Sequence, residues 1–300
     1  MADQASMLTT YLKSRILLLP AIPCRTASSD YGITRGAIFI WVAFILFINH
    51  TFWIINARIF TSVASSASDI FAVGIFQYMA WYAVFRLLAS GDPVPPRHSD
   101  LPVAATLCLV ILLPTSRMVW VSAAGVGAYL CLFSAGDRNF RAAGTVLIAL
   151  SVQEFWGHIL FNFVALPVLL VETAVVGTLL EVTQAGISWQ GNAISGEDGH
   201  GIMIYTGCSS FHNLSLALLC WATVSRLRDQ NWQKRHFTTL LVVTISMILL
   251  NTSRLYLMAL SDNHFKYWHD GAGAEIFAVG ASVTILLISL YGTKSEGEYL

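Results

Sequence analysis

Eight apolar stretches fill most of this 300-residue chain, and polar segments separate them. They cover residues 36–56, 70–89, 101–113, 118–135, 142–161, 208–224, 237–257 and 272–291. A helix needs about 20 apolar residues to cross the hydrocarbon core of a bilayer, and most of the stretches approach this length. Only 11% of the residues are charged, against roughly 25% in soluble domains. The sequence therefore predicts an all-α polytopic membrane protein with about eight transmembrane helices.

The pattern changes between the fifth and sixth stretches. Residues 163–182 are apolar but contain Pro167 and two glutamates, so we expect them to be re-entrant or to lie on the outer surface. Residues 183–207 are rich in glycine, and their pieces 186–189 and 201–205 predict a small β-ribbon. The predicted organisation is an N-terminal cytoplasmic or interfacial segment (1–35) and a single transmembrane domain (36–300). Within that domain the ribbon (183–207) precedes the last three helices (208–291).

Basic residues in short loops predict the orientation of the helices. The loop 226–236, RLRDQNWQKRH, holds four Lys and Arg residues and should be cytoplasmic, because such residues accumulate on that side. The basic N-terminal segment favours the same side, which gives eight spans with both termini inside. The glycine-rich ribbon and the helix ends next to it should then lie on the extracytoplasmic side.

Three reactive residues stand at helix ends on that predicted side: Cys208, Arg254 and His269. Ionisable groups near hydrocarbon are costly and usually face a protein interior or a wet cavity. A thiol attacks as its thiolate, an arginine supplies a permanent cation, and an imidazole exchanges protons near neutral pH. Together they have the chemistry of a nucleophilic acyl-transfer site.

Neighbouring residues suggest supporting roles. The amides of Ser209 and Ser210, at the expected helix start, would bind a developing oxyanion. Asn251 or Asp270 would orient a partner side chain. His212 lies one helical turn after Cys208 and is a rival to His269 as the base.

Other interpretations remain open at this level. Taken singly, a cysteine at a helix end is usually structural and an interfacial arginine usually extends to the headgroups. Cys208 with His212, His264 and His269 would also suit a transition metal, but the spacing matches no strong motif, so we expect neither a metal nor a cofactor. Glu154 and His158, one turn apart, suggest a buried polar pair. The net charge of zero gives no face for nucleic acid.

The order of the motifs resembles the exosortase/archaeosortase family of membrane transpeptidases. The glycine-rich stretch ISWQGNAISGEDGHGIMIYTG leads into CSS at Cys208, and a basic loop follows. NTSR matches the family's Asn-x-x-Arg at Asn251 and Arg254, and WHDGAG matches its aromatic-His-Asp pattern at Trp268, His269 and Asp270. The resemblance covers about the last 130 residues. Ser210 stands where the family commonly has glycine, so the pocket would be narrower or the substrate different.

The resemblance implies that Cys208 is the nucleophile, Arg254 the essential cation and His269 the proton donor and acceptor. It implies substrates that are secreted bacterial proteins with a C-terminal sorting signal, made of a Pro-containing motif, a transmembrane helix and a basic tail. The enzyme would cleave them through a thioester at the outer face of the inner membrane and pass the acyl group to another molecule, such as a surface glycan or lipid. Exopolysaccharide machinery is an expected partner. The alternatives are a non-catalytic membrane component of an exopolysaccharide assembly complex and, third, a metal-dependent membrane hydrolase.

Overall fold

The computed structural model describes residues 32–60, 67–113, 115–134, 136–196, 199–228 and 231–294. Within the helices, the side chains of residues 55–60, 67–73 and 212 also lie outside the description. Residues 1–31 of the predicted N-terminal segment (1–35) therefore lie outside the described residues. The described residues from Ile33 onward form one compact unit.

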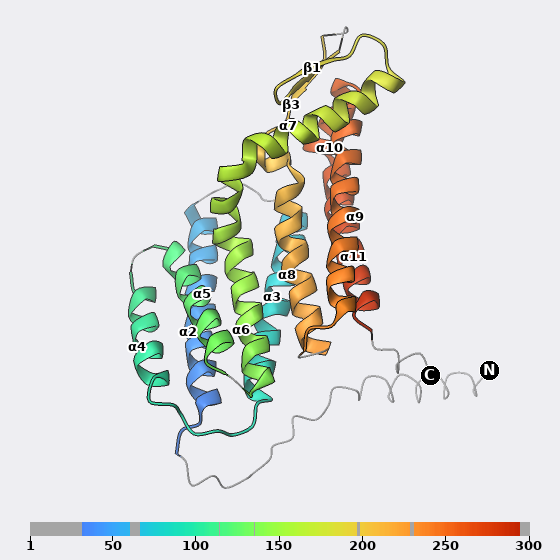
Figure 1. Cartoon of the computed structure of the whole chain (residues 1–300). Coiled ribbons are helices and arrows are strands. Elements are labelled where there is room, and N and C mark those ends of the chain that lie inside the picture. The colour runs from blue at the N-terminus through green and yellow to red at the C-terminus, as the bar shows by residue number, and fades with distance from the viewer. Residues whose placement is uncertain are drawn as a thin grey trace, which may run out of the picture. The chain divides into compact units, whose positions relative to one another are not determined.

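Helices make up most of this unit, and many run side by side (Figure 1). They are α2 (Arg35–Phe60), α3 (Ala67–Ala89), α4 (Asp100–Ile111), α5 (Arg117–Leu132), α6 (Arg138–Ser151), the π-helical turn η1 (Val152–Trp156), α7 (Gly157–Thr183), the 3₁₀ turn η2 (Thr206–Cys208), α8 (Ser210–Arg228), α9 (Lys234–Ala259), α10 (Asp262–His269) and α11 (Ala272–Gly292). Large apolar side chains such as Trp41 and Phe163 are 65% and 82% exposed. A protein that places such side chains on its outside is suited to lipid surroundings.

Length and composition identify four candidate membrane spans among the described residues: Arg35–Ile54, Arg138–Thr183, Lys234–Ala259 and Ala272–Gly292. These helices make the chain a multi-pass membrane protein. α4 and α5 have 12 and 16 residues, which correspond to about 18 and 24 Å at 1.5 Å per residue. Both are shorter than the roughly 30 Å hydrocarbon core. The number of eight spans therefore stays a prediction.

Small residues allow close contact between α5 and α6. A Cβ added to Gly127 would come within 2.7 Å of the Gly144 carbonyl oxygen, and one added to Gly144 would come within 2.6 Å of the Gly127 oxygen. Because only glycine fits at both positions, the two backbones can touch, as is common between membrane helices. α6 in turn packs against α3 and α8, and the main apolar core lies among these helices.

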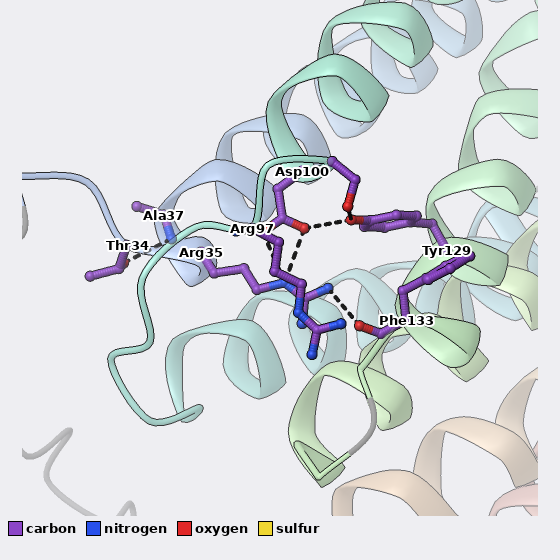
Figure 2. Close-up of polar contacts among 8 residues, drawn as sticks. Thr34, Arg35, Ala37, Arg97, Asp100, Tyr129 and Phe133 are labelled. Carbon is purple, nitrogen blue, oxygen red and sulfur yellow. Dashed lines mark hydrogen bonds and ion pairs between the residues drawn. The ribbon is translucent and has the colours of Figure 1, made fainter.

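A buried ion pair joins the first residues of α2 and α4 (Figure 2). Arg35 Nε donates to both carboxylate oxygens of Asp100 at 3.1 Å, and the two side chains are 2% and 0% exposed. Tyr129 Oη donates to the same carboxylate at 2.7 Å, and Arg35 Nη2 donates to the Phe133 carbonyl at 3.2 Å. The cluster ties the first turns of α2 and α4 to the last turn of α5, and its charges are paired, as buried charges must be.

Residues 163–182, which we expected to be re-entrant or to lie on the surface, belong to the continuous helix α7. Pro167 lies inside this helix, and a proline removes one backbone hydrogen bond and bends a helix. Figure 1 shows α7 leaving the direction of α6 and running obliquely toward the strands. Its second half contacts α9 and the strands. Whether this half crosses the bilayer stays a prediction.

Three short strands follow α7: β1 (Ser188–Gln190), β2 (Ala193–Ser195) and β3 (Gly201–Met203). They form an antiparallel sheet in the order β1-β2-β3, with Trp189 opposite Ile194 and Ile194 opposite Ile202. The two pieces expected from the sequence, 186–189 and 201–205, therefore do not pair with each other, because the unpredicted strand β2 lies between them. Their extracytoplasmic position stays a prediction.

A second apolar core fixes this sheet to the helices. Its buried members come from α7, the sheet region and α9, and they are Leu169, Val176, Leu180, Ile194, Ile202, Ile204, Leu255 and Ala259. The Trp189 ring lies against Gly177, where any Cβ would overlap it. Cys208 packs against the same core, so the sheet and α7 help to position the residue predicted to be the nucleophile.

Candidate active site

Cys208 lies in the short link between the sheet and α8. It is the last residue of η2, and α8 begins two residues later at Ser210. The helix thus begins two residues after the predicted start of this stretch at Cys208. Its thiol is half-buried, and it stands just before the first turn of α8, where the positive end of the helix dipole favours an anion such as a thiolate.

The His269 imidazole faces this thiol. Its Nε2 lies 4.0 Å from Cys208 Sγ, and its Nδ1 lies 2.7 Å from Asp270 Oδ1. The ring also stacks on Phe265 with 4.8 Å between ring centroids. His269 is the last residue of α10, a short helix that the sequence did not predict, and α11 begins three residues later at Ala272. The carboxylate and the stacked ring together orient Nε2 toward the sulfur.

Arg254 reaches the same place from α9. Its Nε donates to the Trp268 carbonyl at 3.1 Å, and its guanidinium carbon lies 4.9 Å from the centre of the Phe277 ring. The cation is within electrostatic range of Cys208 and Asp270. Because Trp268 precedes His269, the same guanidinium both anchors the backbone beside the imidazole and places a positive charge near the thiol.

Asn251, one turn before Arg254, holds the backbone of the cysteine. Its Nδ2 donates to the Cys208 carbonyl at 2.9 Å, and its Oδ1 accepts from Asn213 Nδ2 at 3.4 Å. The side chain is 1% exposed. We expected Asn251 or Asp270 to orient a partner side chain; Asp270 contacts the His269 ring, whereas Asn251 fixes the main chain of η2.

The amides of Ser209 and Ser210, which we expected to bind an oxyanion, both have hydrogen-bond partners within the protein. The Ser209 amide donates to the Thr206 carbonyl at 3.3 Å, and the Ser210 amide donates to Glu172 Oε1 at 2.8 Å. Both N–H groups are therefore engaged within the protein.

Glu172 of α7 also contributes to the site, and the sequence did not predict this contribution. Its Oε1 accepts hydrogen bonds from both the amide and the hydroxyl of Ser210, and the side chain is 8% exposed. It therefore caps the first turn of α8 from a separate helix. A carboxylate within an apolar stretch was the available signal, since such groups are costly in hydrocarbon unless they have a partner. Nothing in the spacing pointed to Ser210, 38 residues away.

Replacing Glu172 should disturb the position of Cys208. We expect Glu172→Ala to lower the stability of the purified protein by about 1 kcal/mol, the usual effect of losing a helix cap, and to slow processing of a substrate by roughly tenfold, a loss equivalent to about 1.4 kcal/mol. Glu172→Gln keeps an oxygen for Ser210 and should restore most of the activity. Equal activity of the alanine variant and the wild type would show that this cap does not position the cysteine.

His212 and His264 were also candidates for the site. The side chain of His212 lies outside the described residues, although its backbone is in α8. His264 is exposed and its Nδ1 lies 2.9 Å from Ser261 Oγ, the side chain that caps α10. Among the described residues no group of three or more His, Cys, Asp or Glu side chains is arranged to hold a metal ion.

The fold and the site together define a multi-pass membrane protein with a cysteine, a histidine and an arginine gathered at one end of its helices. The profile of the transmembrane exosortase family (Exosortase_EpsH) matches residues 62–286, three quarters of the chain, and the protein belongs to this family. This confirms the resemblance seen in the sequence. No curated protein matches the chain, and no solved structure does.

Proposed function

We propose that the protein is a cysteine transpeptidase or protease that cleaves a membrane-anchored protein through a thioester on Cys208. The observation that carries this proposal is the approach of His269 Nε2 to within 4.0 Å of Cys208 Sγ, with Asp270 on the opposite ring nitrogen. A thiol, an imidazole and an orienting carboxylate in that order are the parts of an activated nucleophile. Contacts of this kind are often long without substrate and tighten when it binds.

The proposed first half-reaction forms the thioester. His269 Nε2 removes the proton from Cys208 Sγ, and the thiolate attacks the carbonyl carbon of the scissile peptide bond. Arg254 stabilises the negative charge that develops on the carbonyl oxygen. The protonated imidazole then donates its proton to the leaving amine as the C–N bond breaks, so the imidazole returns to its neutral form.

The second half-reaction releases the acyl group. An acceptor loses a proton to His269 Nε2 and attacks the thioester carbon, and the C–S bond breaks as the thiolate leaves. The proton returns to the sulfur, which restores the starting state. His212 remains a rival for the base, since it lies four residues after Cys208, in the first turn of α8.

The family supports a substrate class for this reaction. We propose secreted proteins that carry a Pro-containing motif, a transmembrane helix and a basic tail at the C-terminus. The site would lie on the extracytoplasmic side of the bacterial inner membrane, because the basic 226–236 loop at the opposite ends of α8 and α9 favours the cytoplasm. A link to exopolysaccharide production belongs to the same proposal.

Thiol reactivity tests whether the site is built for nucleophilic attack. We expect iodoacetamide to alkylate Cys208 at least about tenfold faster than Cys108 and Cys131, because the positive end of α8 and the guanidinium of Arg254 would stabilise the negative charge on the attacking sulfur. Peptide mass spectrometry of the folded protein would compare all three cysteines, each of which is half-buried, in one sample. Arg254→Gln should remove most of the advantage. Equal rates at the three cysteines would favour a non-catalytic scaffold.

A further inference from the structure

The edge strand β3 leads directly into the candidate active site. β3 ends at Met203, and the backbone is still extended at Tyr205, with φ −97° and ψ 167°. The turn η2 then carries the chain to Cys208. Extended residues rise about 3.3 Å each and 3₁₀ residues about 2.0 Å, so Met203 and Cys208 are separated by no more than about 13 Å. A peptide bound along β3 would reach the thiol within about four extended residues.

One edge of β3 pairs with β2, and the main-chain groups of alternate residues point the other way. The Ile204 amide donates to the Asn192 carbonyl at 2.8 Å, so these two residues form a hydrogen-bonded pair of the ladder. In an antiparallel ladder such pairs alternate with pairs that exchange no hydrogen bonds. The N–H and C=O groups of Gly201 and Met203 therefore point away from β2, and the N–H of Tyr205 follows the same alternation.

These outward-pointing groups are accessible. Gly201 is exposed, and Met203 and Tyr205 are 49% and 61% exposed. Within the part of the chain that the structure describes, the three N–H groups and the carbonyls of Gly201 and Met203 have no hydrogen-bond partner. The Tyr205 carbonyl accepts from the Cys208 amide at 2.9 Å. The edge of β3 thus offers three donors and two acceptors to another strand.

The packing of the sheet leaves this edge uncovered. β3 contacts α9, and the contact uses the inner face of the strand. Ile202 and Ile204 are 5% and 1% exposed and belong to the second apolar core together with Leu255 of α9. At the other edge of the sheet, the ring of Trp189 lies against Gly177 of α7. β3 is therefore fixed through its inner face, while its outer edge stays accessible.

The sequence of β3 lacks side chains that discourage pairing. Edge strands are commonly protected by their short length, by lysine or proline, or by inward-pointing charges. β3 is short, but the run GIMIY at residues 201–205 contains neither proline nor a charged residue. Met203 and Tyr205 are two residues apart, so their side chains share the outer face of the strand. Alternate side chains of an added strand would contact them there.

We propose that β3 binds the extended segment of the substrate protein that carries the scissile peptide bond, which joins the sheet as a fourth strand. The identity of this segment as the substrate rests on the proposed function. In strand addition, main-chain hydrogen bonds provide affinity and alternate side chains provide specificity. The same arrangement would keep the scissile carbonyl out of a helix, where its oxygen would be hydrogen-bonded within the substrate.

Disulfide crosslinking tests the binding without catalysis. The protein carrying Cys208→Ala and Met203→Cys would be co-expressed with a secreted protein that ends in a Pro-containing motif, a transmembrane helix and a basic tail. Single cysteines would be placed, one position at a time, along the segment before that helix. We expect crosslinks on non-reducing gels at every second position, because the side chains of a strand alternate between its two faces. Cys208→Ala without the new cysteine should give none.

The position of the new cysteine provides the matched control. Tyr205→Cys should move the strongest crosslink by two substrate residues, and the direction of this move reports whether the added strand is antiparallel or parallel. Gln190→Cys should give little crosslinking. Gln190 is exposed and lies in the same cross-strand row as Ala193 and Met203, but on the opposite edge strand β1, about 10 Å from Met203.

A proline substitution tests the main-chain hydrogen bonds. Met203→Pro removes an N–H that points away from β2, and proline is tolerated at such edge positions because no ladder hydrogen bond is lost. The preceding residue, Ile202, already has the extended conformation that proline requires of it. We expect Met203→Pro to lower processing by at least about tenfold, and Met203→Ala, which keeps the N–H, by less than about threefold. Cleavage in membranes with equal amounts of each variant would measure both.

Several outcomes would overturn strand addition. These are crosslinks that repeat every 3.6 residues as in a helix, crosslinks at every position, none at all, or equally strong crosslinks from Gln190→Cys. Equal processing by Met203→Pro and Met203→Ala would also contradict it. Processing by the wild type without alternating crosslinks would refute this inference alone. Alternating crosslinks, combined with processing that continues in Cys208→Ala or is absent from the wild type, would refute the proposed function alone.

Discussion

Cys208→Ala is expected to abolish processing of a co-expressed secreted protein that ends in a Pro-containing motif, a transmembrane helix and a basic tail. Removing the nucleophile from a covalent mechanism lowers the rate by at least about 10³-fold, since the remaining groups cannot form the intermediate. Cys208→Ser should be nearly as inactive, because a hydroxyl is a far weaker nucleophile than a thiolate. Immunoblots of the cleaved and uncleaved substrate would measure the loss.

The matched control for this prediction is Cys108→Ala. Cys108 is half-buried in α4, and α4 takes no part in the candidate site. This variant should insert into the membrane and process the substrate as the wild type does. Processing that persists with Cys208→Ala would mean that the thiol is not the attacking group.

Arg254→Gln is expected to lower processing by about 10²–10³-fold, the range found when one donor to a developing oxyanion is removed. Arg254→Lys should recover only part of this loss. A lysine keeps the positive charge, but it lacks the Nε–H that donates to the Trp268 carbonyl at 3.1 Å and so anchors the backbone next to His269. Initial rates of cleavage in membranes that contain equal amounts of each variant would measure both effects.

Arg86→Gln serves as the control for Arg254. Arg86 is an exposed residue in the last turn of α3 and also carries a guanidinium. Its replacement should leave the rate unchanged. Full activity of Arg254→Lys would show that the charge alone matters and that the contact with Trp268 has no part in the reaction.

Much of the helical structure was predictable because apolar stretches of sufficient length have few alternatives to a helix in lipid. Helices occupy all eight predicted stretches, although their crossing of the bilayer stays a prediction. Pro167 suggested a break in residues 163–182, yet these residues form part of one helix. Membrane helices tolerate a proline because neighbouring groups can satisfy the freed backbone. α10 was missed because it has only eight residues, although Ser261 is a recognisable helix cap.

The candidate site was predictable in part for a different reason. Cys208, Arg254 and His269 lie near the ends of successive helices, so antiparallel packing was enough to bring them to one end of the protein. The partner of Ser210 was not predictable. Pro167 indicates a bend in α7, but no sequence pattern shows that the bent helix brings Glu172 to Ser210, 38 residues away. Likewise, no sequence pattern showed that the amides of Ser209 and Ser210 donate hydrogen bonds to Thr206 and Glu172.

Hydroxylamine would capture the proposed thioester on Cys208. When purified wild-type protein cleaves its substrate in the presence of hydroxylamine, a thioester on Cys208 should release the N-terminal fragment as a hydroxamate, which mass spectrometry distinguishes from a free carboxylate. Cys208→Ala should give neither product. We expect the hydroxamate from the wild type; cleavage that yields only the carboxylate, or that continues without Cys208, would rule out the thioester.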